Sequence, residues 1–510
     1  MNRAAAGPAP PSRFQRALDR IERFGNALPH PASLFVILCG LLLVASWAFS
    51  TMGVQVAHPL TGETVAVTNL LSDEGLRRII LGVLPNFISF APLGSVLVSL
   101  LGLAVAEHAG LFSAVVRLVV SATPPRVLTL MVVFAGANSH TLGDVGYVLL
   151  LPLASALFHM VGRHPLAGLA AAFAGVSGGF AANLLLSPTD VILAGLTQEA
   201  ARIIDEAYTV TPLANYFFLG SSVFLVTAVG TFVTEYVVEP RLGAYTGDVE
   251  PEPFVPVSAA ERCGLWWALA AIVGLAALVA VGLQPGGVLQ DPENPGFVGS
   301  YFVRGIVFFI FLFGLVPGVA YGVAAGTITS DKDVYKGMQR TLELVSSYLV
   351  VVFFVAQFVN FFNWTNLGLV LAVNGAAVLQ ASGLGPVPLL LGVILLTTTI
   401  DLMVGSASAK WAMLAPVFVP MFMLLGYAPE LTQVAYRVGD STSNIITPLM
   451  SNFPLVLMFA QRYVPSAGIG TMTATMLPYS MGFLACWSLM LVLWVLAGLP
   501  VGPGAPLFLS

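Results

Sequence analysis

One segment of the sequence, residues 435–448, indicates the fold: it reads AYRVGDSTSNIITP. It lies inside a mainly apolar stretch, 433–456, which is long enough to cross a bilayer. Small polar residues and a proline interrupt that stretch at Gly439–Asn444 and at Pro448. Because an unwound backbone in lipid is costly unless it lines a cavity, the segment predicts a broken transmembrane helix with a functional break.

The whole chain is far too apolar for a water-soluble globule. Of its 510 residues, 20 are Lys or Arg and 25 are Asp or Glu, so 9% are charged, against roughly 25% in soluble domains. Apolar residues make up 57%, which excludes disorder. A net charge of -5 without a broad basic patch argues against nucleic-acid binding, and the three cysteines form no metal or disulfide pattern. The composition predicts an all-α polytopic membrane protein.

Nine apolar stretches are long enough to be crossings. They lie near 31–52, 79–106, 165–186, 212–234, 264–283, 300–327, 343–361, 433–456 and 471–498. Two further apolar regions, 124–160 and 386–427, are interrupted in the middle by small and polar residues, at 136–144 and 405–410. We interpret these two regions as re-entrant hairpins.

The charges support nine crossings plus two hairpins. The tail at 1–30 carries five arginines and is cytoplasmic by the positive-inside rule. The basic loops at 235–263 and 331–343 then also lie inside, and the 284–299 loop, with acidic residues only, lies outside. Arg77 and Arg78 are the exception to the positive-inside rule, because this topology places them on the outer side, before the second crossing. The loop at 235–263 separates a first transmembrane half, 31–234, from a second half, 264–510.

The two halves contain similar units. Each has a short apolar stretch (110–122 or 366–381), then a hairpin, then a broken segment closed by a proline, at Pro188 or Pro448. By the charge count the first hairpin enters from the cytoplasm and the second from outside. Two such units of opposite orientation are typical of a secondary transporter with a binding site near the midplane.

The breaks carry side-chain oxygens, which suit Na⁺ better than a soft metal. Buried aspartates allow H⁺ instead, so the choice between Na⁺ and H⁺ as coupling ion stays open, and no other cofactor is expected. The candidate cation-binding residues are Asn138, Ser139, Asp144, Ser177, Asn183, Asp190, Ser441 and Asn444.

Intramembrane charges are expensive and usually either paired or functional. Arg437 and Asp440 are three apart on a helix, so they either pair with each other or act on a ligand, with Arg437 offering a fork to a substrate carboxylate. Lys410 either contacts an anion or pairs with Asp401 or Asp440.

Three further residues have two interpretations each. Trp411 either packs the second hairpin or stacks on an aromatic substrate ring. Asp190 either caps the following helix or handles a cation or proton. His140 either titrates or is a structural hydrogen-bonded histidine.

Three motifs are distinctive: Ser177–Asn183 (SGGFAAN), Gly405–Ala412 (GSASAKWA) and Ala435–Met450. Together they resemble the AbgT family, the bacterial p-aminobenzoyl-glutamate transporters. The similarity covers roughly residues 30–500. It implies an inner-membrane homodimer of nine spans and two hairpins, and members move p-aminobenzoyl-glutamate or export sulfonamide antimetabolites. The tip of the first hairpin, 138–144, departs from the family pattern.

The resemblance also implies functional residues. The positions that match are Asp190, Ser408, Trp411, Pro429, Arg437, Asp440 and Pro448, and with Lys410 all of these except Asp190 form the expected substrate-binding set. A benzoyl ring suits Trp411, and glutamate carboxylates suit Arg437.

We therefore expect an ion-coupled secondary transporter of aromatic amide anions in the bacterial inner membrane. A dicarboxylate carrier of similar architecture, a channel and an intramembrane enzyme are the alternatives. No Gly-x-Ser-x-Gly or His-Glu-x-x-His motif supports an enzyme, and no ATP-binding loop supports direct use of ATP. The direction of transport is not determined by the sequence.

Overall fold

The computed structural model describes residues 31–509 except 60–61, 122, 140–145, 250–255, 295 and 345. These residues are mainly helical, with one antiparallel pair of short strands, β1 (Gln55–Ala57) and β2 (Thr64–Ala66). Seven helices in this part of the chain are long and apolar enough to cross a membrane. An eighth span results if α16 (Ser346–Trp364) and α17 (Leu367–Ala381), which are bent by 68° at their junction, count as one. The chain is a multi-pass membrane protein.

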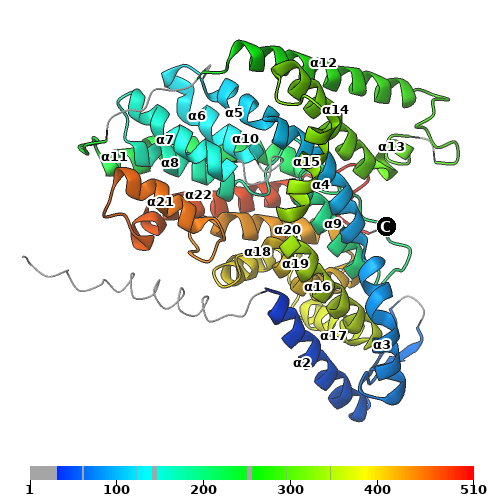
Figure 1. Ribbon diagram of the computed structural model, residues 1–510. Helices are drawn as coiled ribbons and strands as arrows, with labels where there is room; N and C mark the ends of the chain where they lie inside the picture. The colour runs from blue at the N-terminus through cyan, green and yellow to red at the C-terminus, as the bar shows by residue number, and fades with distance from the viewer. Residues whose placement is uncertain are drawn as a thin grey trace, which may run out of the picture.

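One group of helices forms a scaffold along one side of the molecule. It contains, besides α16, α2 (Pro31–Thr51), α3 (Asp73–Ile88), α4 (Ala91–Ala109), α12 (Ala259–Gly282), α13 (Tyr301–Arg304), α14 (Ile306–Ala325) and α15 (Asp331–Leu344). In Figure 1, α12 and α14 form the upper edge, α2 and α3 the lower edge, and α4 runs between them.

The scaffold helices α4 and α14 touch through glycines. A Cβ on Gly314 would lie 2.5 Å from the carbonyl carbon of Gly102, and one on Gly318 would lie 2.6 Å from the nitrogen of Ala106. Small residues spaced by four let two backbones approach in lipid, where van der Waals contact drives helix association. The α4–α14 contact therefore depends on these glycines.

The remaining helices form two cores of similar order. The first contains α5 (Leu111–Ser121), η1 (Pro125–Val127), α6 (Leu128–Asn138), η3 (Gly146–Leu150), α7 (Leu151–Met160), α8 (Pro165–Phe173), η4 (Ala174–Gly178), α9 (Pro188–Ala201), α10 (Tyr216–Val233), η5 (Thr234–Val238) and α11 (Glu239–Leu242). The second contains α17, α18 (Pro386–Asp401), α19 (Ala407–Leu424), α20 (Pro429–Ser443), α21 (Phe453–Tyr463) and α22 (Ile469–Leu496).

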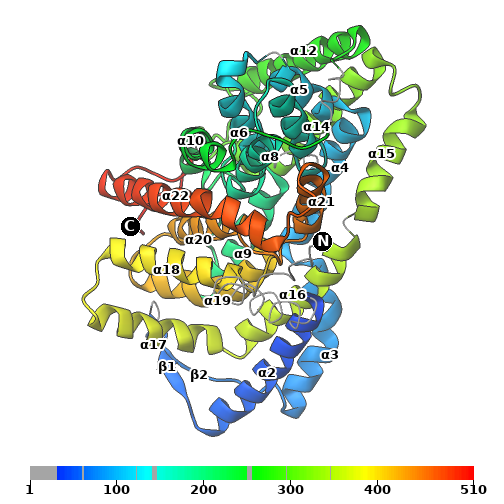
Figure 2. The same ribbon diagram turned by 90° about the vertical axis from the view of Figure 1, so that its left-hand side faces the viewer.

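The contacts between these two cores are reciprocal. Helix α9 of the first core packs against α19 of the second, α21 of the second packs against α7 and α8 of the first, and α10 packs against α22. Figure 2 shows α22 lying between the α6–α8–α10 group and the α18–α20 group. Each contact has a counterpart with the cores exchanged, as an internal repeat requires. The opposite orientation of the two copies in the membrane stays a prediction.

Both predicted broken segments are interrupted. Continuous helix ends at Gly178 in the first core and at Ser443 in the second, and irregular backbone follows at 179–187 and 444–452. The two uninterrupted helices span 165–178 and 429–443, or about 21 Å each at 1.5 Å per residue. That is shorter than the ~30 Å hydrocarbon core. Neither 165–186 nor 433–456 is a single continuous spanning helix.

The two predicted hairpin regions also consist of paired helices. Region 124–160 contains η1 with α6 and then η3 with α7, and region 386–427 contains α18 and α19. The connection at 140–145, with His140 and Asp144, lies outside the described residues. Because helix α19 is itself long enough to cross, re-entry of either hairpin into the membrane stays a prediction.

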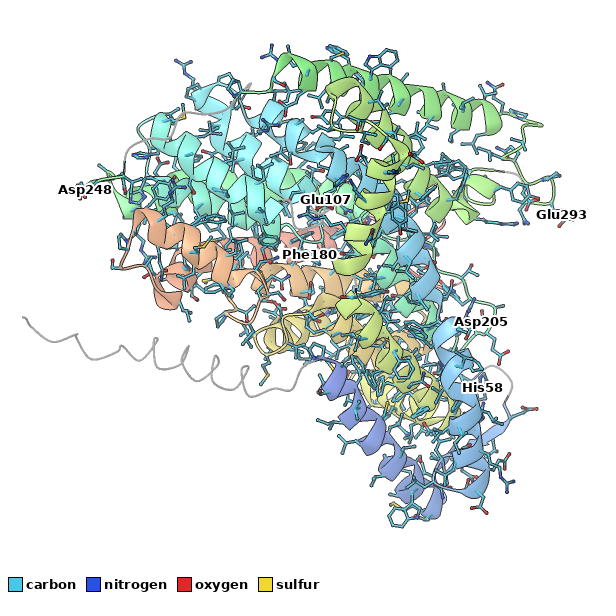
Figure 3. All side chains as sticks on the ribbon, in the orientation of Figure 1. His58, Glu107, Phe180, Asp205, Asp248 and Glu293 are labelled. Carbon is cyan, nitrogen blue, oxygen red and sulfur yellow. The ribbon has the colours of Figure 1, made fainter. Side chains whose placement is uncertain are left out.

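The loops before and after α12 lie at opposite ends of the molecule. Figure 3 labels Asp248, from the loop predicted to be cytoplasmic, at one end and Glu293, from the loop predicted to be outside, at the other. Helix α12 connects the two ends with 24 residues, about 36 Å of helix. This separation fits a membrane crossing between the two loops.

Candidate functional site

A buried ion pair joins the two broken segments. The Oδ1 atom of Asp190, in the first turn of α9, lies 2.6 Å from the Nη2 atom of Arg437, in the middle of α20. The two side chains are 1% and 2% exposed. Since Asp190 belongs to the first core and Arg437 to the second, their charges connect the two repeats at their breaks.

The other oxygen of Asp190 holds the irregular backbone of the first break. Asp190 Oδ2 accepts hydrogen bonds from Asn183 Nδ2 at 2.7 Å, from the backbone nitrogen of Ser187 at 2.6 Å and from Ser187 Oγ at 2.8 Å. The Ser187 contacts form a capping box at the start of α9. Asp190 therefore caps a helix and also neutralises Arg437, so any change of its charge affects the break and the second core together.

Three more charges are buried beside this pair. Lys410, in the first turn of α19, pairs with Asp401 at the end of α18, and its Nζ atom lies 2.5 Å from Oδ1 of Asp440 on α20. The hydroxyl of Tyr436 lies 2.5 Å from the carbonyl oxygen of Ala407 and 3.3 Å from Asp440 Oδ1. The alternative in which Arg437 and Asp440 neutralise each other is wrong, because each has a partner on another element.

The charge of the cluster does not balance. Three carboxylates (Asp190, Asp401 and Asp440) face two cations (Arg437 and Lys410), which leaves a formal charge of -1. Buried charge without compensation is costly at membrane depth. With all five groups ionised, one negative charge of this buried cluster is left uncompensated by these residues.

Several atoms of this region also lack hydrogen-bond partners among the described residues. They are Asp401 Oδ2, Arg437 Nε and Ser441 Oγ, besides Asp190 Oδ1 and Arg437 Nη2, which contact each other as the ion pair described above. Buried polar atoms are normally satisfied, so a group of unsatisfied atoms at one place points to a ligand or ion. Among the described residues no three His, Cys, Asp or Glu side chains gather as a metal site.

Trp411 packs beside the charge cluster. Its ring is fully buried and stacks on Tyr436 at a centroid distance of 4.4 Å. Its Nε1 atom donates to Thr197 Oγ1 at 2.8 Å, and Thr197 in turn donates to Gln433 Oε1 at 2.6 Å. In this structure Trp411 packs the protein rather than presenting a free ring face.

The predicted cation residues of the first core are mostly bound to backbone. Asn138 accepts from the nitrogen of Leu184 at 3.1 Å and donates to Phe134, while Ser139 donates to Gly136. Ser177 lies 3.1 Å from the sulfur of Met450, which comes from the second break. Asn138 thereby fixes the first break to the first hairpin helix.

The remaining predicted residues lie on or near the second break and the second hairpin. Asn444 Nδ2 lies 3.5 Å from Asp440 Oδ2, and Ser408 Oγ lies 3.5 Å from Ser406 Oγ. Pro429 begins α20, and Pro448 lies in the irregular segment after it. Within the described part of the chain, neither Ser408 nor Pro429 makes a side-chain hydrogen bond to the charged groups, whereas Asn444 lies within reach of Asp440.

Three residues of this site were not predicted from the sequence: Thr197, Gln433 and Tyr436. The signal for two of them was present, because Gln433 lies four residues before Arg437 and Tyr436 lies four residues before Asp440 on the same helix. Thr197 comes from the other core and had no local signal.

Comparison with known proteins gives consistent matches over almost the whole chain. Residues 16–509 match the model of the "AbgT putative transporter family". The chain is 41% identical over 487 residues to the p-aminobenzoyl-glutamate transport protein of Escherichia coli K12, covering 95% of each chain.

Two solved structures are similar in both sequence and fold. The YdaH transporter of Alcanivorax borkumensis has a TM-score of 0.88 and 46% identity, over 93% of this chain and all of its own. MtrF of Neisseria gonorrhoeae, described as illuminating a class of antimetabolite efflux pumps, has a TM-score of 0.91 and 47% identity, over 96% of this chain and all of its own. The chain belongs to the AbgT family, whose members are transporters and not enzymes.

Proposed function

We propose that this protein is a secondary active transporter of p-aminobenzoyl-glutamate-like aromatic amide anions, driven by a Na⁺ or H⁺ gradient. The observation that carries the proposal is the Asp190–Arg437 pair between the two breaks, within a buried cluster of charge -1. The similarity to the Escherichia coli transport protein supports the substrate class.

The ion pair suggests how substrate and ion are coupled. A substrate carboxylate that binds the guanidinium of Arg437 competes with Asp190 Oδ1 for it, since Nη2 already lies 2.6 Å from that oxygen. Asp190, once released from Arg437, is a buried carboxylate that needs a proton or a cation. Substrate and coupling ion therefore favour each other's binding, and linkage makes the effect reciprocal.

The substrate's ring needs a separate place. Trp411 is stacked on Tyr436 and hydrogen-bonded to Thr197, so a ring would lie against this layer only after a rearrangement of the second hairpin. Ser408, Pro429 and Pro448, at the ends and breaks of the surrounding helices, are the positions where such a rearrangement would occur.

Transport into proteoliposomes tests this function. Labelled p-aminobenzoyl-glutamate is offered with a Na⁺ gradient alone and with a pH gradient alone, using wild type, Arg437→Ala and the matched control Arg462→Ala on α21. The expected result is flux that follows one of the gradients and is lost in Arg437→Ala only. Gradient-independent flux, or Arg437→Ala behaving as wild type, contradicts the proposal. Competition by succinate but not by aromatic amides would instead favour a dicarboxylate carrier.

Export of sulfonamide antimetabolites is a second candidate function. It is favoured by the similarity to MtrF, whose structure is described in terms of antimetabolite efflux pumps. A sulfonamide lacks the dicarboxylate, so it would rest on Trp411 and neighbouring polar groups and would depend less on Arg437. Measuring sulfonamide accumulation in cells with Arg437→Ala and Trp411→Ala separates the two substrates.

The same family membership supports a homodimer in the bacterial inner membrane with a cytoplasmic N-terminus. Cross-linking in native membranes and labelling of single cysteines at the 235–263 and 284–299 loops test assembly and sidedness.

A further inference from the structure

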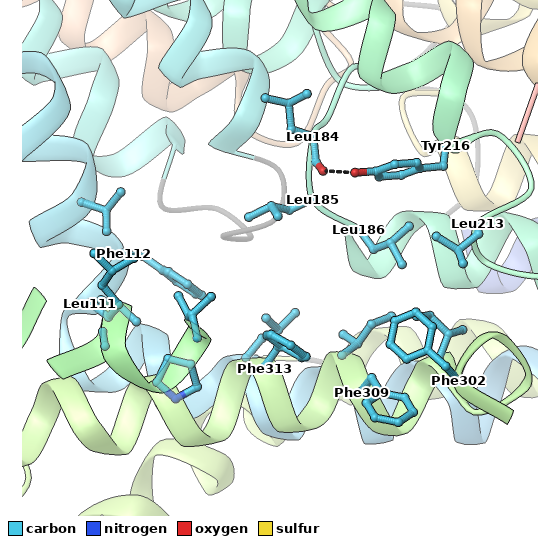
Figure 4. A pocket seen from close by; sticks show the side chains of 18 of the residues that line it. Leu111, Phe112, Leu184, Leu185, Leu186, Leu213, Tyr216, Phe302, Phe309 and Phe313 are labelled. Carbon is cyan, nitrogen blue, oxygen red and sulfur yellow. Dashed lines mark hydrogen bonds between the residues drawn. The ribbon is translucent and has the colours of Figure 1, made fainter. Parts of the chain in front are cut away.

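A long apolar crevice separates the scaffold from the first core, outside the charge cluster. It has a volume of about 750 Å³. One wall is a row of aromatic residues on α14, and the opposite wall is Leu184–Leu186, in the first break (Figure 4). Tyr216 also lines the crevice and donates a hydrogen bond to the carbonyl oxygen of Leu184 at 3.0 Å. Leucine and phenylalanine dominate the lining.

The crevice opens onto an exposed apolar surface of the chain. Leu185, Phe217, Leu269 and Ile272 line it and are exposed at the same time. Leu269 and Ile272 belong to α12, of which only 11% of the most apolar window is buried, the lowest share among the candidate spans of the described chain. In a membrane this opening is in contact with acyl chains, and an apolar cavity left empty would lose dispersion contacts along its walls.

The length of the crevice matches one leaflet. Along α14 its lining extends from Ile306 to Pro317. Eleven helical residues correspond to about 16 Å. Half of a ~30 Å hydrocarbon core is about 15 Å. The crevice therefore has the length of a single acyl chain of one leaflet.

A polar pocket of about 570 Å³ adjoins one end of the crevice. Pro503 lines both cavities, and the neighbours Phe302 and Val303 line the crevice and the pocket respectively. The pocket contains the half-exposed Arg304, whose Nη2 atom lies 2.8 Å from Asp291, together with the carboxylates of Glu293 and Glu430. Counting Asp291, three carboxylates surround this one guanidinium, so their negative charge favours a ligand with an ammonium group. The N–H groups of Arg304 that Asp291 does not use are available to a phosphate.

We propose that the crevice and the pocket together bind one amine-bearing zwitterionic phospholipid, with an acyl chain in the crevice. Arg304 contacts its phosphate, and Glu293 contacts its ammonium group. The bound lipid lies against Leu184–Leu186, the residues between Asn183 and Ser187 that together hold Asp190. The inference does not rest on the proposed transport function.

Native mass spectrometry of the delipidated full-length protein tests the proposal. Phosphatidylethanolamine and phosphatidylglycerol with the same acyl chains are titrated into wild type, Ile272→Trp, which fills the mouth of the crevice, and Arg304→Gln. The matched controls are Leu278→Trp, also exposed on α12 but outside the crevice, and Arg77→Gln, an exposed arginine outside the pocket.

In wild type we expect one tightly bound phosphatidylethanolamine per chain. The affinity should fall by about tenfold or more in each test variant, because Arg304→Gln removes a charged hydrogen bond and Ile272→Trp blocks the apolar site. The controls bind as wild type. Unchanged binding in Ile272→Trp and Arg304→Gln overturns the proposal. Equal binding of phosphatidylglycerol overturns the headgroup assignment, and a change of oligomeric mass in Ile272→Trp assigns the crevice to a second copy of the chain. Thermal unfolding in detergent without lipid identifies a variant that fails to fold, and Leu269→Phe then replaces Ile272→Trp.

Discussion

The guanidinium of Arg437 in the second core neutralises the carboxylate of Asp190 in the first, with 2.6 Å between Nη2 and Oδ1. Asp190 lies on the helix that follows the first break and Arg437 on the helix that precedes the second, so the pair directly links the two repeats at their breaks.

Removing one partner of this pair should destabilise the protein strongly. Arg437→Ala leaves Asp190 as a buried unpaired charge, which costs about 3–5 kcal/mol. The double variant Asp190→Asn with Arg437→Gln should recover much of that loss, because no charge is then left unpaired. Thermal unfolding in detergent measures the stability of the single and the double variant. Equal instability of the single and double variants would contradict the pairing. Lys336→Ala, which removes the exposed partner of the Lys336–Asp333 pair, is the control.

Lys410 should be essential only because it compensates the negative charges of Asp401 and Asp440. Lys410→Met changes the formal charge of the cluster from -1 to -2 and should abolish transport and lower the melting temperature. Adding Asp401→Asn returns the charge to -1 and should restore folding, while Asp440 stays available for a proton or cation. Unfolding temperature and flux are measured on the same preparations. If Lys410→Met alone folds and transports normally, Lys410 does not compensate these carboxylates.

Trp411 should act through packing. Trp411→Phe keeps an aromatic ring against Tyr436 but loses the hydrogen bond to Thr197, at a cost of about 1 kcal/mol. Trp411→Ala leaves a cavity and costs about 3–5 kcal/mol. We expect the substrate affinity of Trp411→Phe to stay within about twofold of wild type, because the variant loses only a neutral hydrogen bond within the protein and keeps the stacked ring. A large loss of affinity with unchanged stability would instead place the substrate ring directly on Trp411.

The glycine contact between α4 and α14 should tolerate no side chain. Gly318→Val places its Cβ against the backbone of Ala106 and should cost about 1–3 kcal/mol or prevent assembly of the scaffold. Gly274→Val on α12, where nothing lies within 4 Å, is the matched control and should be nearly neutral. The melting temperatures of the two variants in the same detergent give the comparison. A similar fall in melting temperature in Gly318→Val and Gly274→Val would mean that the cost comes from helix propensity rather than from packing.

Asp333 should hold the start of α15 over a wide pH range. Hydrogen bonds from the backbone and hydroxyl of Thr329 and from Ser330 lower the pKa of its carboxyl to about 2. Because the folded pKa lies below the unfolded one, this stabilisation is present above pH ~4 and is lost as the pH falls toward 2. The protection factors of the amides at the start of α15, which are corrected for the intrinsic pH dependence of hydrogen exchange, should not change between pH 7 and pH 5 in wild type. They should be lower in Asp333→Ala. Asp331→Ala, in the same turn, is the control; an equal effect there would contradict the capping role.

The sequence predicted the helical breaks because they depend on local chemistry. Glycine, serine, threonine, asparagine and proline between apolar residues interrupt a helix wherever they occur, and the breaks after Gly178 and Ser443 follow from them. The same local information placed Asp190 at a helix start, where the capping box is found. It could not show that Thr197 and Gln433 share a hydrogen bond, since they are brought together only by the contact of α9 with the second core.

The sequence alone determined that the chain crosses a membrane several times, where its apolar helices are interrupted, and which charges lie at those interruptions. Only the tertiary structure decided the partners of these charges. Arg437 and Asp440 are close along the helix, yet Arg437 binds Asp190 and Asp440 binds Lys410. The reason is physical: a buried charge takes the partner with the best geometry, and that geometry depends on how helices from the two halves pack, which no spacing along one helix encodes.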